Sequence, residues 1–147
     1  MKTANSTSSD TTAASIEFAL LQSWLASGSA LELPLHQIES LQQAKGLEVQ
    51  RLLLQAHLQH RGNGDVRPAL RVQGPSGDLL YSHRRLGARS LTTVFGTVEL
   101  VRMGYSRSGG PSIFPLDQAL ALPARSFSYE LQRRLVKACL LYTSGRR

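Results

Sequence analysis

The chain has 147 residues, of which 41% are hydrophobic and 18% charged, so it can form one modest core. Its net charge of +7 is uneven: residues 1–60 carry three basic and five acidic side chains, whereas residues 61–147 carry fourteen basic and five acidic ones. A single cysteine, Cys139, excludes an internal disulfide framework and a cysteine zinc cluster within one chain, and no apolar run approaches the ~20 residues of a membrane span. These features predict a cytoplasmic protein without a membrane partner, whose second half binds an anionic partner, most often nucleic acid.

The first part of the chain reads as a helical region behind a polar tail. Residues 1–13 are small and polar, and we expect a disordered tail because they have little apolar surface to bury. Residues 14–61 show helical spacing, with a first helix over about 14–26 and a second that starts near Pro34 and that Gly46 interrupts. The first helix is predicted to face the core through an apolar stripe formed by Ile16, Ala19, Leu20 and Trp24 and widened by Phe18, Leu21 and Leu25. The loop over 61–65, where the charge changes sign, is the expected boundary.

Residues 62–138 read as a basic region of a β-hairpin and a helix. Apolar and polar residues alternate over 89–105, which predicts two strands, and we expect them to join at Gly96-Thr97 because glycine at the first position suits a type II′ turn. Two shorter strands, over 70–73 and 78–83, are expected to complete one antiparallel sheet of three or four strands. A closing helix is predicted to begin near Ser126 or Ser128, which are both good N-caps. The predicted fold class is therefore α+β: N-terminal helices, a small antiparallel sheet with a β-hairpin, and a closing C-terminal helix.

The sequence offers no residues arranged for catalysis. A Gly-x-Ser-x-Gly elbow and a Walker loop are both absent from the sequence. The carboxylates of Asp78, Glu99 and Asp117 are of the type that holds metal ions for phosphoryl transfer, but nothing in their spacing shows that they converge. Glu99, on a strand, is more simply an exposed partner for a cross-strand arginine. We therefore predict no catalytic, cofactor-binding or metal-binding residue.

Basic residues carry the candidate function. Arginine outnumbers lysine in the second half, and its planar guanidinium suits phosphate. Five arginines lie on or beside the hairpin with Tyr81 and Tyr105 among them, a pattern typical of a sheet face that follows a nucleic-acid backbone. The alternative is surface charge that is balanced within the sheet. The predicted nucleic-acid-binding residues, including three on the closing helix, are Arg84, Arg85, Arg89, Arg102, Arg107, Arg133, Arg134 and Lys137.

Three segments in the same order resemble the N-terminal part of bacterial insertion-sequence transposases of the ISKra type. The first, over 91–105, follows the family's T-x-x-G-x-V-x-(L/V)-x-R-x-x-Y hairpin, the second, over 116–123, follows its L-D-x-A-L-x-L-P segment, and the third, over 129–135, resembles its following helix. The resemblance covers roughly residues 70–138, whereas residues 14–60 fit only loosely.

The resemblance implies a part in transposon DNA binding or in transposase assembly, without catalysis by this region. In that family an acidic, metal-binding catalytic domain follows, so a divalent metal is implied for the full-length parent and no cofactor for this part. The implied partners are DNA and, through the region that follows, a second copy of the transposase, in the bacterial cytoplasm. Two alternatives stay open: a stand-alone nucleic-acid-binding or regulatory module, and a protein-interaction domain whose basic face binds acidic protein.

The end of the chain has a second resemblance. Residues 139–144, Cys-Leu-Leu-Tyr-Thr-Ser, are what TGT-CTC-TTA-TAC-ACA-TCT encodes, and that string resembles the mosaic-end adapter of sequencing-library preparation. We interpret residues 139–147 as an adapter-derived or non-native tail. The alternative is a natural helix end whose apolar residues pack.

Overall fold

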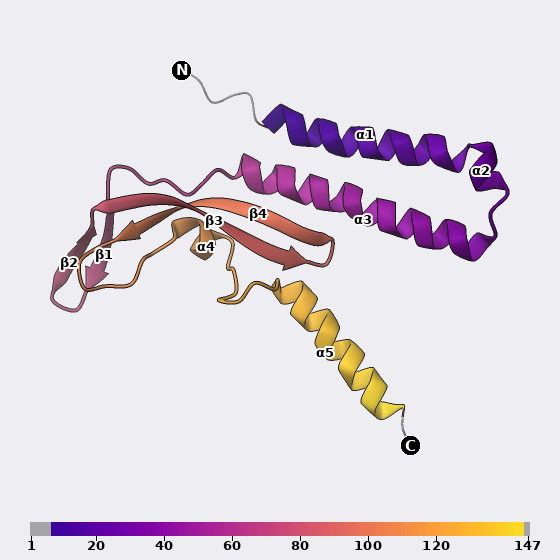
Figure 1. Cartoon of the computed structure of the whole chain (residues 1–147). Helices are drawn as coiled ribbons and strands as arrows, with labels where there is room; N and C mark the ends of the chain where they lie inside the picture. The colour runs from indigo at the N-terminus through magenta and orange to yellow at the C-terminus, as the bar shows by residue number, and fades with distance from the viewer. Residues whose placement is uncertain (1–6, 146–147) are drawn as a thin grey trace.

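The computed structural model describes the backbone of residues 7–145 and the side chains of residues 11–145. A long helical pair leads into two β-hairpins, and a final helix projects from them (Figure 1). The predicted α+β class is confirmed. The elements are α1 (Thr7–Leu25), α2 (Gly28–Leu31), α3 (Leu35–His60), β1 (Leu70–Gly74), β2 (Gly77–Tyr81), β3 (His83–Thr93), β4 (Gly96–Ser106), α4 (Pro115–Ala119) and α5 (Tyr129–Ser144). None of the described helices is long and apolar enough to cross a bilayer.

The helical region differs from expectation at two places. Helix α1 begins at Thr7, so residues 7–13, expected to belong to a disordered tail, are helical, while residues 1–6 lie outside the described residues. Helix α3 starts after Pro34, as predicted, but it runs through Gly46 without a break. The cost of one glycine in a helix is about 1 kcal/mol, and the packing of α1 along α3 compensates for it.

The face by which α1 packs is another correction. Ile16 and Leu20, predicted to face the core, are 55% and 58% exposed, and Ala19 is exposed as well. Trp24, Leu21 and Leu25 are half-buried, as expected, and the other buried or half-buried positions are Ala13, Ala14 and Glu17. The apolar residues of α1 are spread around the whole helix, and α3 covers only one side of it. Part of the apolar surface of α1 therefore stays exposed to solvent.

The strands form two separate two-stranded sheets rather than the single sheet expected. Strand β1 pairs with β2, and β3 pairs with β4, both antiparallel. In the second hairpin Thr93 lies opposite Gly96, so the turn residues are Val94 and Phe95 rather than Gly96-Thr97. The Thr93 hydroxyl donates to the Gly96 carbonyl at 2.8 Å and accepts from the Phe95 N–H at 3.2 Å, and Gly96 has φ of 125°, a conformation that favours glycine.

Strand β4 buries opposite faces at its two ends. Near the turn, Val98 and Leu100 pack with Leu91 and Leu116 in one core cluster, which Leu54 and Leu58 of α3 cover. At the far end the other face is buried, where Met103 and Tyr105 pack with Tyr81 and with partly buried side chains of β1 and β2. The first hairpin thus lies over one end of the second, which explains why the strands do not merge into one sheet.

Helix α5 begins where the sequence predicted. The Ser128 hydroxyl accepts from the Leu131 N–H at 3.2 Å and caps the helix, and Glu130 lies in its first turn. Backbone hydrogen bonds join Thr92 of β3 to Ser126 and Ser128, which fixes the start of α5 at the edge of the hairpin. Beyond that attachment α5 projects away from the rest of the chain (Figure 1), and none of its residues is buried.

Candidate nucleic-acid interface

Two of the predicted DNA-binding arginines have largely buried side chains that form ion pairs within the fold. Arg89 and Arg102 lie on the same face of the β3–β4 hairpin, and both donate to the Oδ2 atom of Asp117, at the first turn of α4. The three side chains are only 14%, 16% and 19% exposed. Arg89 also donates to the backbone carbonyls of Pro123 and Arg125, at 2.5 and 2.9 Å. This Asp117 triad, defined as Arg89, Asp117 and Arg102, holds residues 115–125 against the hairpin.

Arg102 is further enclosed by an aromatic ring. Its guanidinium carbon lies 3.8 Å from the centre of the Phe114 ring, a cation–π distance. Phe114 fits there because Gly104 lacks a side chain: a Cβ at that position would lie 2.7 Å from the ring. Burial, together with the nearby charge of Arg89, lowers the pKa of the Arg102 guanidinium, although arginine stays charged at neutral pH. Arg102 therefore serves packing and is poorly placed to reach phosphate.

Arg84 belongs to a second group, the Asp65 cluster, formed by Asp65, Arg67, Arg84 and Tyr105. The Arg84 and Arg67 guanidinium groups donate to Asp65 Oδ2 at 2.5 and 2.7 Å, and the Tyr105 hydroxyl donates to Oδ1 at 2.7 Å. These hydrogen bonds, that of Arg67 most of all, hold the pKa of Asp65 well below its ordinary value. The Tyr105 hydroxyl and Asp65 in turn raise the pKa of Arg84. The loop predicted as a boundary is thus bonded to the end of the hairpin.

The two tyrosines expected to lie among the arginines are part of the core. Tyr105 is fully buried and Tyr81 is 5% exposed, so neither presents a ring on which a base could stack. Arg107 lies over the Tyr81 ring at 5.5 Å from its centre, which orients this arginine along the sheet. The expected basic face with interleaved aromatics is therefore not formed: Arg84 lies on one face of β3, and Arg85 and Arg89 lie on the other.

Arg85 is the hairpin arginine that remains available. It is exposed on β3, opposite Gly104, and its side chain makes no ion pair or hydrogen bond with any described residue. On α5, Arg133 and Arg134 bond to Glu130 but stay 56% and 61% exposed, and their hydrogen bonds lower the pKa of Glu130 to about 2. Lys137 is exposed, without an ion pair among residues 11–145.

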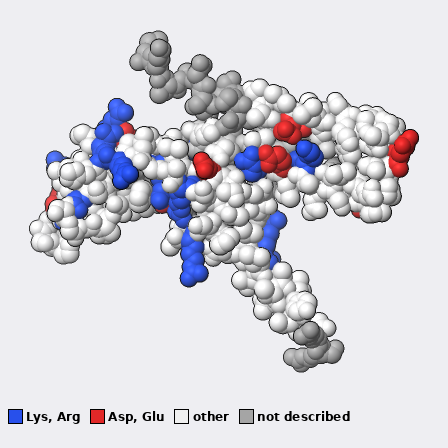
Figure 2. All heavy atoms as spheres, in the orientation of Figure 1, with Lys and Arg blue, Asp and Glu red and all other residues white. Residues whose placement is uncertain are grey.

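Three further exposed arginines were missed by the sequence reasoning, which concentrated on the hairpin. They share with Arg85 the lack of any acidic partner within the described part of the chain, and they are Arg61, Arg71 and Arg125. Figure 2 shows Lys and Arg gathered over the strands and near the start of α5, whereas the far end of the helical pair shows acidic side chains. The excess of basic residues in the second half of the sequence thus lies over the strands and the start of α5, apart from the far end of the helical pair.

The carboxylates do not assemble into a metal site. Asp117 is held by two arginines, and Glu99 lies opposite Ser90 rather than opposite an arginine, with an exposed side chain. Asp78 lies beside the turn of the first hairpin. Within the part of the chain that the structure describes, no three His, Cys, Asp or Glu side chains come together in a way that could hold a metal ion.

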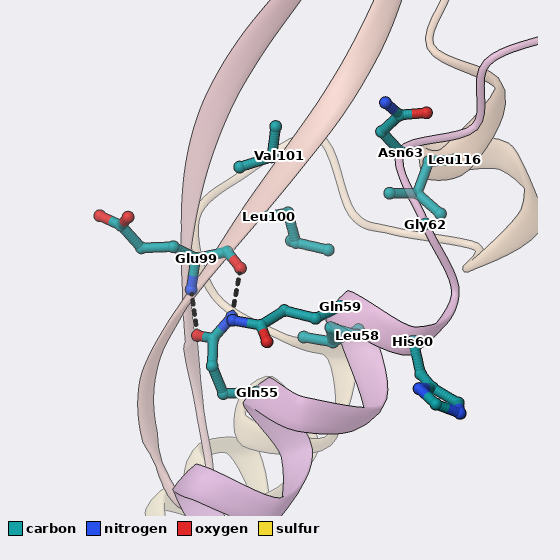
Figure 3. Close-up of a pocket in the computed structure, with 10 residues that line it drawn as sticks. All are labelled: Gln55, Leu58, Gln59, His60, Gly62, Asn63, Glu99, Leu100, Val101 and Leu116. Carbon is teal, nitrogen blue, oxygen red and sulfur yellow. Dashed lines mark hydrogen bonds between the residues drawn. The ribbon is translucent and has the colours of Figure 1, made fainter. Parts of the chain in front are cut away.

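A cavity of about 750 Å³ lies where α3 meets the outer edge of β4 (Figure 3). The side-chain amide of Gln55 donates to the Glu99 carbonyl at 2.8 Å and accepts from the Glu99 N–H at 2.9 Å. It thus satisfies the two outward backbone groups of Glu99 that a neighbouring strand would otherwise pair with. Leu100 and Leu116 add apolar surface, and Asn63 lies across the opening. No charged side chain other than Glu99 lines it, so the cavity does not extend the basic surface.

The first two of the three segments that carry the transposase resemblance contact each other and support the fold. Thr93 and Gly96 flank the turn, Val98 and Leu100 fill the core, and Arg102 of the first segment pairs with Asp117 of the second. The exposed arginines without an acidic partner among the described residues, Arg61, Arg71, Arg85 and Arg125, lie outside these segments. Comparison of the chain with family models, with curated proteins and with solved structures finds no match.

Proposed function

We propose that the chain corresponds to the N-terminal part of a transposase of the ISKra type and contributes to binding of transposon DNA, without catalysis by itself. The observation that carries the proposal is that two segments of the resemblance, far apart in sequence, form one unit through the Arg102–Asp117 ion pair. Residues that support each other in this way form a scaffold that holds the exposed cations of the strands in place.

The mode of binding that the geometry favours is contact with phosphates. Arg85, Arg61, Arg71 and Arg125 are exposed and lack acidic partners among the described residues, so a phosphate can bind them without breaking an ion pair. Tyr81 and Tyr105 are buried, so neither ring is available for base stacking. Binding should therefore be strongly salt-dependent and tolerant of base sequence, since phosphate contacts carry no direct sequence information.

Arg85 and Arg84 offer a matched test because they are neighbours on one strand with opposite environments. Fluorescence anisotropy with a mixed-sequence duplex, titrated at several salt concentrations, gives the slope of log affinity against log salt. The change Arg85→Ala should lower that slope by roughly 1, the loss of one phosphate contact, while Arg85→Lys should keep it. Arg84→Ala should leave the slope nearly unchanged, since that side chain is bound to Asp65.

Two results would contradict the proposal. Duplex binding that does not weaken with salt would exclude a phosphate interface. An unchanged slope in Arg85→Ala, with affinity retained, would remove Arg85 from it. Exposed apolar side chains on α1 and α5, such as Phe18 at 51% and Leu135 at 54%, favour a role in assembly as the second candidate, and that role predicts self-association without DNA.

A further inference from the structure

The two outer edges of the β3–β4 hairpin differ in how many of their outward backbone groups are hydrogen-bonded to the rest of the chain. On β4, the outward backbone groups of Glu99 bond to Gln55, and the Met103 N–H donates to the Asn63 carbonyl at 2.8 Å. Tyr105 exchanges two hydrogen bonds of 2.8 Å with Ile113. Groups from α3, from the following loop and from the segment before α4 therefore cover most of this edge.

The edge of β3 is covered only at its end. The Thr92 N–H donates to the Ser126 carbonyl at 2.7 Å, and the Ser128 N–H donates to the Thr92 carbonyl at 2.9 Å. Backbone groups alternate in direction along a strand, so every second residue before Thr92 presents its N–H and C=O on this same side. Those residues are Arg84, Leu86, Ala88 and Ser90; all are exposed, and their backbone groups have no hydrogen-bond partner among the described residues. Residues 84–90 are named here the open β3 edge.

The fold itself sets the limits of this edge. The short segment 126–128 already adds to β3 in parallel, at the bridge between Thr92 and Phe127. Arg89 donates to the carbonyls of Pro123 and Arg125, the residues that lead into this segment. A strand added to β3 therefore has room up to Ser90 and not beyond it.

The charge of β3 indicates what can bind there. The strand contains three arginines and no acidic residue, and Arg85 has no ion pair with the described residues. Opposite charges placed across from each other on adjacent strands stabilise the pairing, and like charges destabilise it. If two copies of the chain paired antiparallel over the whole open edge, Arg85 of one would lie opposite Arg89 of the other, so a second copy would supply no acidic side chain to Arg85.

We propose that the open β3 edge is a docking site for an extended acidic segment of a partner protein, which adds to the hairpin as a third strand. Main-chain hydrogen bonds to the outward groups provide the binding, and an acidic side chain opposite Arg85 provides the selectivity. This interaction shares Arg85 with the proposed DNA interface, but it differs from DNA binding in that it also depends on the backbone groups of residues 84–90.

A proline at the edge tests this directly. Ala88→Pro removes one outward N–H but breaks no bond to β4, and proline is tolerated on edge strands. Ala88→Val is the matched control, since it keeps the N–H. The probe is an acetylated peptide as long as residues 84–90 in which glutamate alternates with threonine, measured by calorimetry. We expect binding to the wild-type chain and to Ala88→Val, and an affinity lower by about threefold or more in Ala88→Pro.

Further measurements make the outcome decisive. The same peptide with lysine in place of glutamate should not bind, and the glutamate peptide should slow amide exchange at Leu86 and Ala88 of the wild-type chain. Equal binding to Ala88→Pro and Ala88→Val, no binding to the wild-type chain, or unchanged amide exchange would overturn the proposal. Dimers of the free chain that Ala88→Pro dissociates would show self-pairing instead. Ala88→Pro should keep the salt slope for DNA, so failure of this proposal is distinguishable from failure of the DNA-binding one.

Discussion

Removal of the Asp117 carboxylate should destabilise the fold more than any loss of an exposed ion pair. Asp117→Ala leaves two guanidinium groups close together, each from a side chain less than one-fifth exposed. Arg89 keeps its two carbonyl partners, so Arg102 is the charge left without an acceptor, with only the Phe114 ring beside it. Breaking a fully buried pair costs about 3–5 kcal/mol and a surface pair about 0–1 kcal/mol. At this partial exposure we expect about 2–3 kcal/mol, a loss of roughly 6–10 °C in melting temperature for a chain of this length.

Thermal and urea unfolding followed by circular dichroism measure this loss. Glu130→Ala is the control, because it breaks the exposed pairs with Arg133 and Arg134 and should leave the melting temperature nearly unchanged. The double change Asp117→Ala with Arg102→Met removes the stranded charge as well and should recover part of the loss. A single variant that melts within about 2 °C of the wild type, or a double variant less stable than the single one, would refute the role of the Asp117 triad.

Two further predictions concern acid stability and the C-terminal tail. The folded pKa of Asp65 is below its ordinary 3.8, so its contribution to stability is full above that value and is lost as pH falls below it. Asp65→Asn should therefore lower the melting temperature at neutral pH and flatten its decline between about pH 5 and pH 2; equal pH profiles would contradict this. Removal of residues 139–147 should shift the melting temperature by less than about 2 °C, since residues 139–145 are exposed; a loss of several degrees would mean that Leu140 and Leu141 pack.

Local patterns in the sequence were sufficient to predict the fold class and most elements. Alternation over 89–105 predicted the long hairpin, Pro34 and Ser128 marked helix starts, and the charge asymmetry marked the basic part of the chain. These signals are local because they depend on period, capping chemistry and composition. The prediction placed the turn at the wrong residues. Thr93 closes the hairpin through hydrogen bonds to Phe95 and Gly96, so the turn is formed by Val94 and Phe95, and the glycine lies directly after the turn rather than within it.

Only the tertiary structure decided which charges are free. The eight basic residues predicted to bind nucleic acid could not be distinguished in the sequence. In the structure, Asp117 forms ion pairs with Arg89 and Arg102, and Asp65 forms one with Arg84. Arg85 is the one hairpin arginine whose side chain has no partner among the described residues. The acids that neutralise them come from segments 15 to 28 residues away, a separation that no periodicity reports. The strand edges follow the same rule: whether an outward backbone N–H is bonded depends on which distant segment lies beside it. Along β3, the outward backbone groups of Arg84, Leu86, Ala88 and Ser90 have no partner among the described residues.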